Sequence, residues 1–143
     1  MKSHPLLILL IIIPTCLFAG NPDKVSLVDM FMGVKNSSNC VIGPQLPHGS
    51  VNPAPQTPNG GHNGYDENDV IRGFGQLHVS GIGWGRYGQV FISPQVGFKP
   101  GETEHDSPKS DEVATPYYYK VNLDRYKIKT EITPTHHLSL IHI

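Results

Sequence analysis

One glycine-rich stretch, residues 73–88, gathers a histidine, a tryptophan and a tyrosine in the sequence Gly-Phe-Gly-Gln-Leu-His-Val-Ser-Gly-Ile-Gly-Trp-Gly-Arg-Tyr-Gly. Glycine weakens regular structure and lets a ligand approach the backbone, whereas tryptophan and tyrosine offer flat apolar faces beside polar donors. Sugar rings bind to that combination. We therefore expect Trp84, between Gly83 and Gly85, to contact a substrate; a tryptophan buried in the core is the alternative.

Four further residues are candidates for substrate binding. His78 and Ser80 belong to the same stretch, and the Ser80-Gly81 pair would let the backbone approach a sugar hydroxyl. A histidine at the end of a strand is more often a structural hydrogen-bond donor than a ligand, and this is the alternative for His78. His62 and Tyr65 lie in a second glycine-rich segment, Pro-Asn-Gly-Gly-His-Asn-Gly-Tyr, and complete the predicted set.

Asp66, Glu67 and Asp69 form the densest acidic group in the chain. Such a group can hold a metal ion or act in acid–base catalysis, but the asparagines and glycine beside it are turn formers. We therefore interpret it as a solvated turn. The chain contains no zinc-ligand spacing, phosphate-binding loop or nucleophile motif. On this reading the sequence assigns no catalytic residue and no metal ligand.

The elements that position these residues are predicted to be short strands. Alternating apolar and polar residues indicate an antiparallel hairpin, Tyr117–Leu123 and Tyr126–Thr133, across the Asp124-Arg125 turn. Further strands are predicted at Val25–Met32, Phe74–Ser80 and Gln89–Ser93. The 15 glycines and 13 prolines cluster between the strands and disfavour long helices. The expected fold is all-β, a partial antiparallel β-sandwich with long Pro/Gly-rich loops.

Two long connections are interpreted differently. Residues 35–69 are so dense in turn signals that few strands fit between them. We predict an ordered binding loop rather than disorder, because apolar residues such as Ile42, Val51 and Tyr65 would anchor it. The polar, charged insert Lys99–Glu112 is expected to be a solvated surface loop.

The first 19 residues have the pattern of a secretory signal peptide. Lys2 precedes the apolar run Leu6–Ile13, and small residues lead to a cleavage point before Gly20. The apolar segment is shorter than the roughly 20 residues that span a bilayer. We therefore predict that residues 1–19 are removed and that the exported protein has no membrane attachment after cleavage. Cys40 then remains as the cysteine of the mature chain and is expected to be a small buried hydrophobe.

The charge of the chain bears on its partners. The formal net charge is −1, with 11 Lys and Arg residues scattered among 12 Asp and Glu residues. A protein that binds nucleic acid would show a basic patch. We therefore expect no nucleic-acid partner.

Five sequence blocks follow one another across about residues 25–135. They read VDMFMG, GPQLPHGSV, GF with LHVSGIG, YYKVNL and IKTEIT. In this order they resemble the blocks that open glycoside hydrolase family 92. The chain departs from the family pattern at Met30 and His48, where the family often has proline and phenylalanine.

The resemblance implies an exported, calcium-dependent exo-α-mannosidase that acts on mannose-rich glycans with inversion of configuration. The family joins an N-terminal β-sandwich to a larger C-terminal α-helical toroid, which holds most of its general acid, general base and calcium ligands. Residues 20–137 would then be an incomplete N-terminal sandwich that contributes to the pocket wall. The catalytic domain would lie outside this chain, which alone would be inactive. In a bacterium the enzyme would be periplasmic or associated with the outer membrane.

The last six residues, 138–143, follow nothing in the family pattern, whereas Thr133-Pro134-Thr135 still does. The codons CTG TCT CTT ATA CAC ATC would encode them, and this string ends a transposon adaptor used for sequencing libraries. We interpret the segment as an adaptor-derived artefact outside the fold. A free-standing carbohydrate-binding module is the alternative function. It would be expected to close its sheets, whereas the family continues with more strands here.

Overall fold

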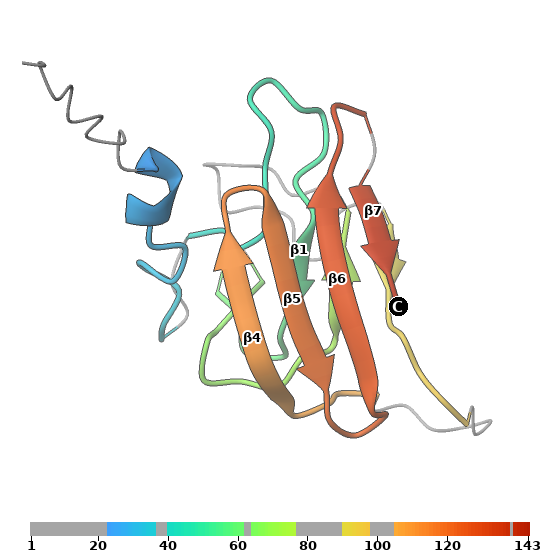
Figure 1. Cartoon of the computed structure of the whole chain (residues 1–143). Helices are drawn as coiled ribbons and strands as arrows, with labels where there is room; N and C mark the ends of the chain where they lie inside the picture. Colours follow the sequence, from blue (N-terminus) through green and yellow to red (C-terminus); the bar gives the residue numbers. More distant parts are fainter. Residues whose placement is uncertain (1–22, 37–39, 62–63, 77–89, 98–104, 138) are drawn as a thin grey trace, which may run out of the picture.

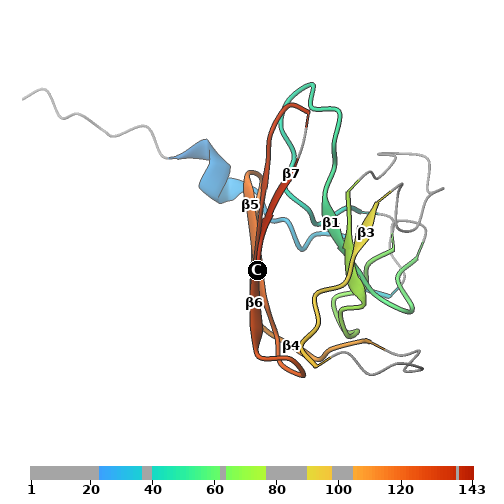
Figure 2. The ribbon, with the colours of Figure 1, turned by 90° about the vertical axis from the view of Figure 1, so that its right-hand side faces the viewer.

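The chain folds into two antiparallel β-sheets that lie face to face (Figure 1 and Figure 2). The computed structural model describes residues 23–36, 40–61, 64–76, 90–97, 105–137 and 139–143. Within them, the first sheet has the order β1-β2-β3, and the second has the order β4-β5-β6-β7. The bounds are β1 Ala54–Gln56, β2 Gly73–Gly75, β3 Phe91–Ile92, β4 Lys109–Thr115, β5 Tyr118–Leu123, β6 Ile128–Pro134 and β7 Ser139–His142. The predicted all-β antiparallel fold is confirmed.

The hairpin predicted near the end of the chain is strands β5 and β6. Val121 pairs with Thr130, and Leu123 pairs with Ile128. Burial alternates along β5, as expected for a strand with one face on the core. The turn closes with a hydrogen bond from the Tyr126 backbone N–H to the Leu123 carbonyl at 3.2 Å. The alternation thus predicts both strands correctly, whereas the turn is longer than the expected Asp124-Arg125 pair, because residues 124–127 separate β5 from β6.

The hydrophobic core lies between the two sheets. Tyr119 of β5 and Phe74 of β2 meet edge to face, with ring centroids 6.5 Å apart and an interplanar angle of 63°. Both side chains are fully buried. The other buried members of the core are Val34, Ile42, Tyr65, Ile71, Val121, Leu123 and Ile132. Aromatic side chains thus join the layers in the geometry that aromatic pairs prefer.

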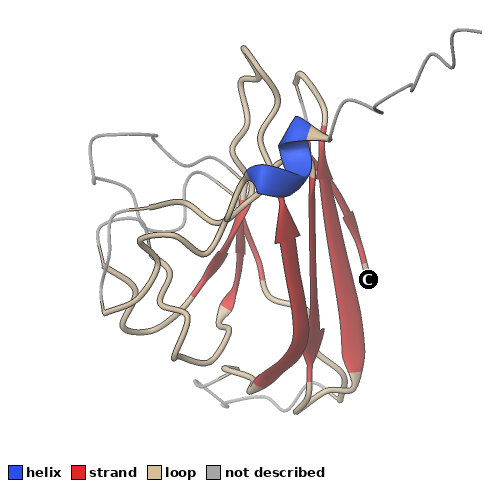
Figure 3. Ribbon diagram, turned by 60° about the vertical axis from the view of Figure 1, so that its left-hand side comes forward, coloured by secondary structure: helices blue, strands red, loops and turns tan. Residues whose placement is uncertain are grey.

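The long connection over residues 35–69 is ordered where the structure describes it. Ile42 is fully buried, and Val51 and Tyr65 are 5% and 1% exposed, so these predicted anchors do reach the interior. The connection also contains strand β1, which turn density concealed. Figure 3 shows the loops gathered around the short-stranded sheet, away from the four longer strands. Cys40 is exposed, which corrects the expectation of a buried thiol.

The strand expected at Val25–Met32 is wrong. The structure has a 3-10 helix, η1, at Lys24–Leu27, followed by turns. Asp23 Oδ1 accepts a hydrogen bond from the Val25 backbone N–H at 3.1 Å, and Asp29 Oδ1 accepts one from the Phe31 backbone N–H at 2.9 Å. Aspartate side chains that bond nearby backbone groups compete with strand pairing. Two such caps explain why the alternation failed here.

The polar insert Lys99–Glu112 is likewise not a loop throughout. Its last four residues begin strand β4, in which Lys109 pairs with Leu123 and Ser110 pairs with Asn122. An edge strand of an antiparallel sheet can be polar on its outer face, so the charges of this segment are compatible with a strand as well as with a loop. The error concerns function as well as fold, because Lys109 and Glu112 turn inward.

Residues 139–142, expected to lie outside the fold, form strand β7 beside β6. Ile141 pairs with Ile132, and Leu140 pairs with Thr133. The pairing shows that the edge of β6 accepts a further strand. The origin of the segment stays a prediction. Over the residues described, no helix is long and apolar enough to cross a bilayer.

Candidate functional site

Most of the predicted substrate contacts fall outside the described residues. Trp84, His78 and Ser80 lie in residues 77–89, and His62 lies in residues 62–63. Their roles stay predictions. Tyr65 is described, and its side chain lies in the interior with 1% of its surface exposed.

Strands β2 and β3 fix the two ends of the segment that carries Trp84. Phe74 pairs with Ile92, and the Gln76 backbone N–H donates to the Val90 carbonyl at 3.0 Å. The residues before and after 77–89 are therefore neighbours at one end of the short-stranded sheet. A long insertion between paired strands is a usual place for a binding loop.

Tyr65 belongs to a buried polar cluster that also contains Lys109, Glu112 and Tyr119. The Tyr65 hydroxyl donates to Glu112 Oε1 at 2.7 Å, and the Tyr119 hydroxyl donates to the same oxygen at 2.5 Å. Lys109 Nζ lies 2.9 Å from Glu112 Oε2 and donates to the Tyr65 hydroxyl at 2.6 Å. It also lies 4.5 Å from the centroid of the Tyr65 ring. The cluster ties a loop residue to strands β4 and β5.

The electrostatics of the cluster favour two neutral tyrosines beside one charge pair. Burial raises the pKa of the Tyr65 hydroxyl far above its ordinary value, and the neighbouring Glu112 carboxylate adds to the rise. Burial also raises the pKa of Tyr119 well above its ordinary value, with Glu112 again contributing. The side chains of Lys109 and Glu112 are only 11% and 12% exposed, so water screens their pairing weakly.

This arrangement is suited to holding structure rather than to acid–base chemistry. Both oxygens of Glu112 are engaged by donors from within the protein. A general acid or base must reach a proton of the substrate, and Glu112 is enclosed by its partners. Chemically, the cluster can orient Tyr65.

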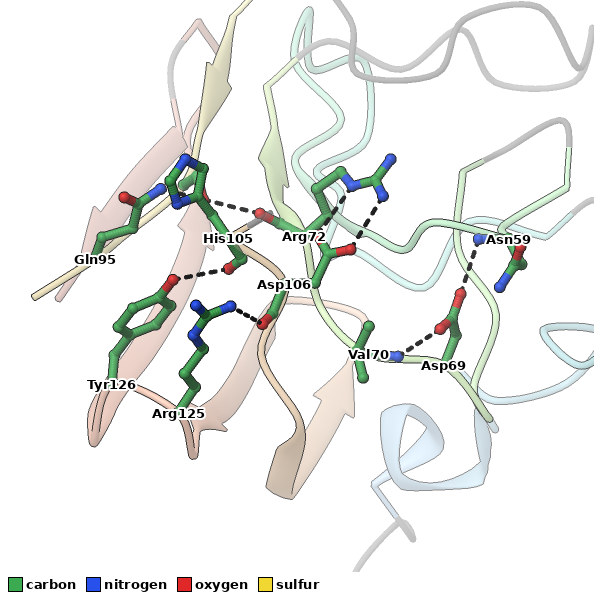
Figure 4. A network of polar contacts seen from close by, with 10 residues as sticks. Asn59, Asp69, Val70, Arg72, Gln95, His105, Asp106, Arg125 and Tyr126 are labelled. Atoms are coloured by element: carbon green, nitrogen blue, oxygen red, sulfur yellow. Dashed lines mark hydrogen bonds and ion pairs between the residues drawn. The ribbon is translucent and has the colours of Figure 1, made fainter. Parts of the chain in front are cut away.

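A second polar network joins the ends of several segments (Figure 4). Arg72 binds the Asp106 carboxylate in a bidentate pair, Nε to Oδ1 and Nη2 to Oδ2, each at 3.0 Å. Arg125 Nη1 donates to the Asp106 carbonyl at 3.3 Å, and the Tyr126 hydroxyl donates to the His105 carbonyl at 3.2 Å. The network fastens residues 105–106 to the start of β2 and to the β5–β6 turn.

The acidic group at Asp66–Asp69 forms a turn, although Asp66 is buried with 8% of its surface exposed. Asp66 Oδ1 accepts from the Asn68 backbone N–H at 2.9 Å. The two carboxylate oxygens of Asp69 accept from the Asn59 and Val70 backbone N–H groups, each at 2.8 Å. These oxygens serve the backbone, whereas calcium needs about six to eight oxygen ligands around one point. The described part of the chain shows no group of three or more His, Cys, Asp or Glu that could hold a metal ion. The described acidic residues therefore do not fit a calcium site.

Comparison with protein families identifies the family of this chain. The model of the glycosyl hydrolase family 92 N-terminal domain matches residues 27–143. The chain belongs to glycosyl hydrolase family 92. No curated protein matches the chain.

Solved structures of family 92 resemble the chain in sequence and in fold. The α-mannosidase BT3965 from Bacteroides thetaiotaomicron, in complex with mannoimidazole, is 28% identical with a TM-score of 0.71 over 82% of this chain. A second structure of BT3965, described without that ligand, is 27% identical to the chain, with a TM-score of 0.69 over 82% of this chain. The family 92 glycosyl hydrolase ccman5 is 26% identical, with a TM-score of 0.67 over 80% of this chain. The chain spans only 17% to 18% of the length of these structures.

Sequence reasoning missed the residues that anchor this part of the family 92 sandwich. The charges of Lys109 and Glu112 predict a solvated loop, whereas both residues belong to β4 and form a buried pair. The sequence offers one indication of strand β4. The alternating strand Tyr117–Leu123 has two edges, and the predicted hairpin pairs only one of them, so a second antiparallel strand could be expected on the other edge. No periodicity marks the inward turn of Glu112, because it arises from a bulge.

Proposed function

We propose that this chain is the N-terminal β-sandwich of an exported α-mannosidase that removes mannose from glycans. The observation that carries the proposal is the family 92 match over residues 27–143, together with its likeness to solved family 92 enzymes. BT3965, one of these, is an α-mannosidase described in complex with mannoimidazole. The signal-peptide pattern in residues 1–19 supports export, to the periplasm or outer membrane of a bacterium.

In this proposal the sandwich contributes to the wall of the substrate pocket, and the remainder of the enzyme supplies the chemistry. An inverting glycosidase needs two carboxylates about 6.5–9.5 Å apart, with room for a water between one of them and the sugar. The described carboxylates serve turns, ion pairs and the buried cluster instead. We place the acid, the base and most of the calcium ligands in the remainder of the enzyme, outside the described residues of this chain.

The test is to recover the full gene and assay two proteins, the complete enzyme and residues 20–137 alone. The complete enzyme should release mannose from an α-linked mannobiose and give the inverted anomer, as followed by proton NMR. A chelator should abolish its activity, and added calcium should restore it. Residues 20–137 should release no mannose with calcium present.

Two results would contradict the proposal. One is a complete enzyme that leaves α-mannosides intact under all calcium conditions. The other is turnover by residues 20–137 that disappears on Asp66→Asn. Tight mannoside binding by residues 20–137 without turnover would instead support a carbohydrate-binding module.

Trp84 is proposed as a contact for the sugar ring. In the complete enzyme, Trp84→Ala should lower kcat/KM by roughly ten- to thirtyfold, because a stacked ring contributes about 1–2 kcal/mol. The melting temperature should change little. A tryptophan in the core behaves differently, since its truncation costs about 3–5 kcal/mol of stability. A large fall in melting temperature with unchanged efficiency per folded molecule would remove Trp84 from the pocket.

A further inference from the structure

Strand β4 contains a bulge that turns the Glu112 side chain inward. The pairing of β4 with β5 is regular except for a register shift between Ser110 and Val113. Asp111, inside the shift, adopts a φ of 49°, in the left-handed region. Residues three positions apart face opposite sides of a regular strand, yet Lys109 and Glu112 form an ion pair at 2.9 Å. The bulge therefore places both charges on one face.

Tyr65 is the member of the cluster that comes from outside the four-stranded sheet. The residue before it, Gly64, packs directly on the last residue of β1: a Cβ atom at Gly64 would lie 1.8 Å from Gln56 Oε1. The Thr57 backbone N–H donates to the Gly64 carbonyl at 2.7 Å, and the Asp66 backbone N–H donates to Thr57 Oγ1 at 2.9 Å. Fixing the Tyr65 hydroxyl thus fixes Gly64 and Asp66 against Thr57 and the end of β1.

Apolar side chains in place of this cluster would be expected to hold the core together equally well. Desolvating two charges costs several kcal/mol per ion, and apolar residues of similar volume often stabilise a core equally well. The left-handed backbone of Asp111 adds a smaller cost, because aspartate tolerates this region better than most other residues. A directed carboxylate offers what an apolar contact lacks, namely a fixed orientation of its partners. The orientation is passed to β1, which pairs with β2, and β2 leads in the chain to the predicted contact Trp84.

We propose that Glu112 is a positioning residue that, through Tyr65, sets the orientation of Thr57, Gly64 and Asp66 and of the β1–β2 pair for mannoside binding. The role in binding rests on the proposed function. The orientation itself does not, and the two parts are tested separately.

The orientation is tested by hydrogen–deuterium exchange on the 143-residue chain. In Glu112→Gln and in the milder Tyr65→Phe, peptides that cover Thr57, Gly64 and Asp66 should exchange at least about tenfold faster. Peptides from β5 and β6 should exchange as in the wild type. The control is Glu131→Gln, which makes the same chemical change in a more exposed pair, Lys129 with Glu131 at 2.6 Å. Unchanged exchange of the peptides that cover Thr57, Gly64 and Asp66 in folded Tyr65→Phe would overturn the proposal.

The binding role is tested on the complete enzyme. Tyr65→Phe and Glu112→Gln should raise KM for an α-mannobiose by about tenfold while kcat stays within about twofold, because a misplaced wall weakens binding of substrate and transition state alike. Glu131→Gln should leave both constants unchanged. Equal KM for variants and wild type, per folded molecule, would refute the binding role even with a clear exchange effect. A wild-type enzyme inactive on mannosides, with exchange still dependent on Glu112, would refute the proposed function and leave the orientation standing.

Discussion

Tyr65 and Tyr119 donate their hydroxyl protons to one carboxylate, and this makes the fold sensitive to alkaline pH. Both pKa values are raised, chiefly by burial and then by Glu112. A group whose pKa is higher in the folded state holds its proton more tightly there. Stability is therefore complete below the unfolded pKa of about 10 and is lost as the pH rises above it. Each tyrosine contributes a slope of up to about 1.4 kcal/mol per pH unit.

The measurement is urea unfolding of the chain at a series of pH values through this range. Tyr119→Phe should show a shallower loss of stability with pH than the wild type, since one of the two buried hydroxyls that bind Glu112 is gone. Asp66 and Glu67 also raise the pKa of Tyr65, to a smaller extent than burial and Glu112, and both residues are the same in the variant and the wild type. Equal slopes for the variant and the wild type would show that the buried hydroxyls do not control alkaline stability.

Thr130 offers a separate test of buried polarity. It is fully buried on β6, and its Oγ1 has no hydrogen-bond partner among the described residues. Thr130→Val keeps the branched shape and removes the unpaired hydroxyl, so we expect a gain of about 1 kcal/mol in the free energy of unfolding. Thr133→Val, on the exposed face of the same strand, should change stability by less than about 0.5 kcal/mol. A loss of stability in Thr130→Val would reveal a partner for this hydroxyl.

At the scale of elements, the 35–69 connection is held by backbone packed directly on backbone. A Cβ atom at Gly43 would lie 1.6 Å from the Pro53 carbonyl oxygen, next to the start of β1. Gly43→Ala should therefore destabilise the fold by about 3 kcal/mol or more, the upper end of overpacking effects, because neither segment has a side chain that can move aside. The matched control is Gly97→Ala, where nothing lies within 4 Å and φ is +74°. It should cost only about 1–2 kcal/mol, from the left-handed backbone alone. Thermal unfolding measures the loss of stability in each variant. Equal losses of stability in Gly43→Ala and Gly97→Ala would contradict the close packing at Gly43.

At the scale of the whole molecule, apolar side chains gather where η1 meets the β4–β5 turn. Val25, Val28 and Tyr117 line one hollow there, and they are 38%, 51% and 56% exposed. Exposed apolar surface of this kind favours association. We expect the isolated chain to self-associate, with sedimentation that depends on concentration.

The double variant Val28→Ser with Tyr117→Ser should weaken this association. Val96→Ser is the control, because Val96 is 65% exposed and lines a different groove, of about 570 Å³, beside β6. If all three proteins sediment alike at every concentration, the η1 surface does not drive association.

The sequence by itself determined the parts of this protein whose information is local. The β5–β6 hairpin followed from alternation, and the family followed from short blocks in a fixed order. Tertiary structure decided the rest. At η1, hydrogen bonds from the backbone to aspartate side chains stabilise a 3-10 helix where the alternation of apolar residues predicts a strand. At β4, a charged segment that the sequence predicts to be a loop pairs with the edge of β5. The inward turn of Glu112 depends on a one-residue bulge, and its partner Tyr65 lies 47 positions away in the chain. A contact of this kind produces no periodic pattern in the sequence, because the two residues meet only after the two sheets have packed together.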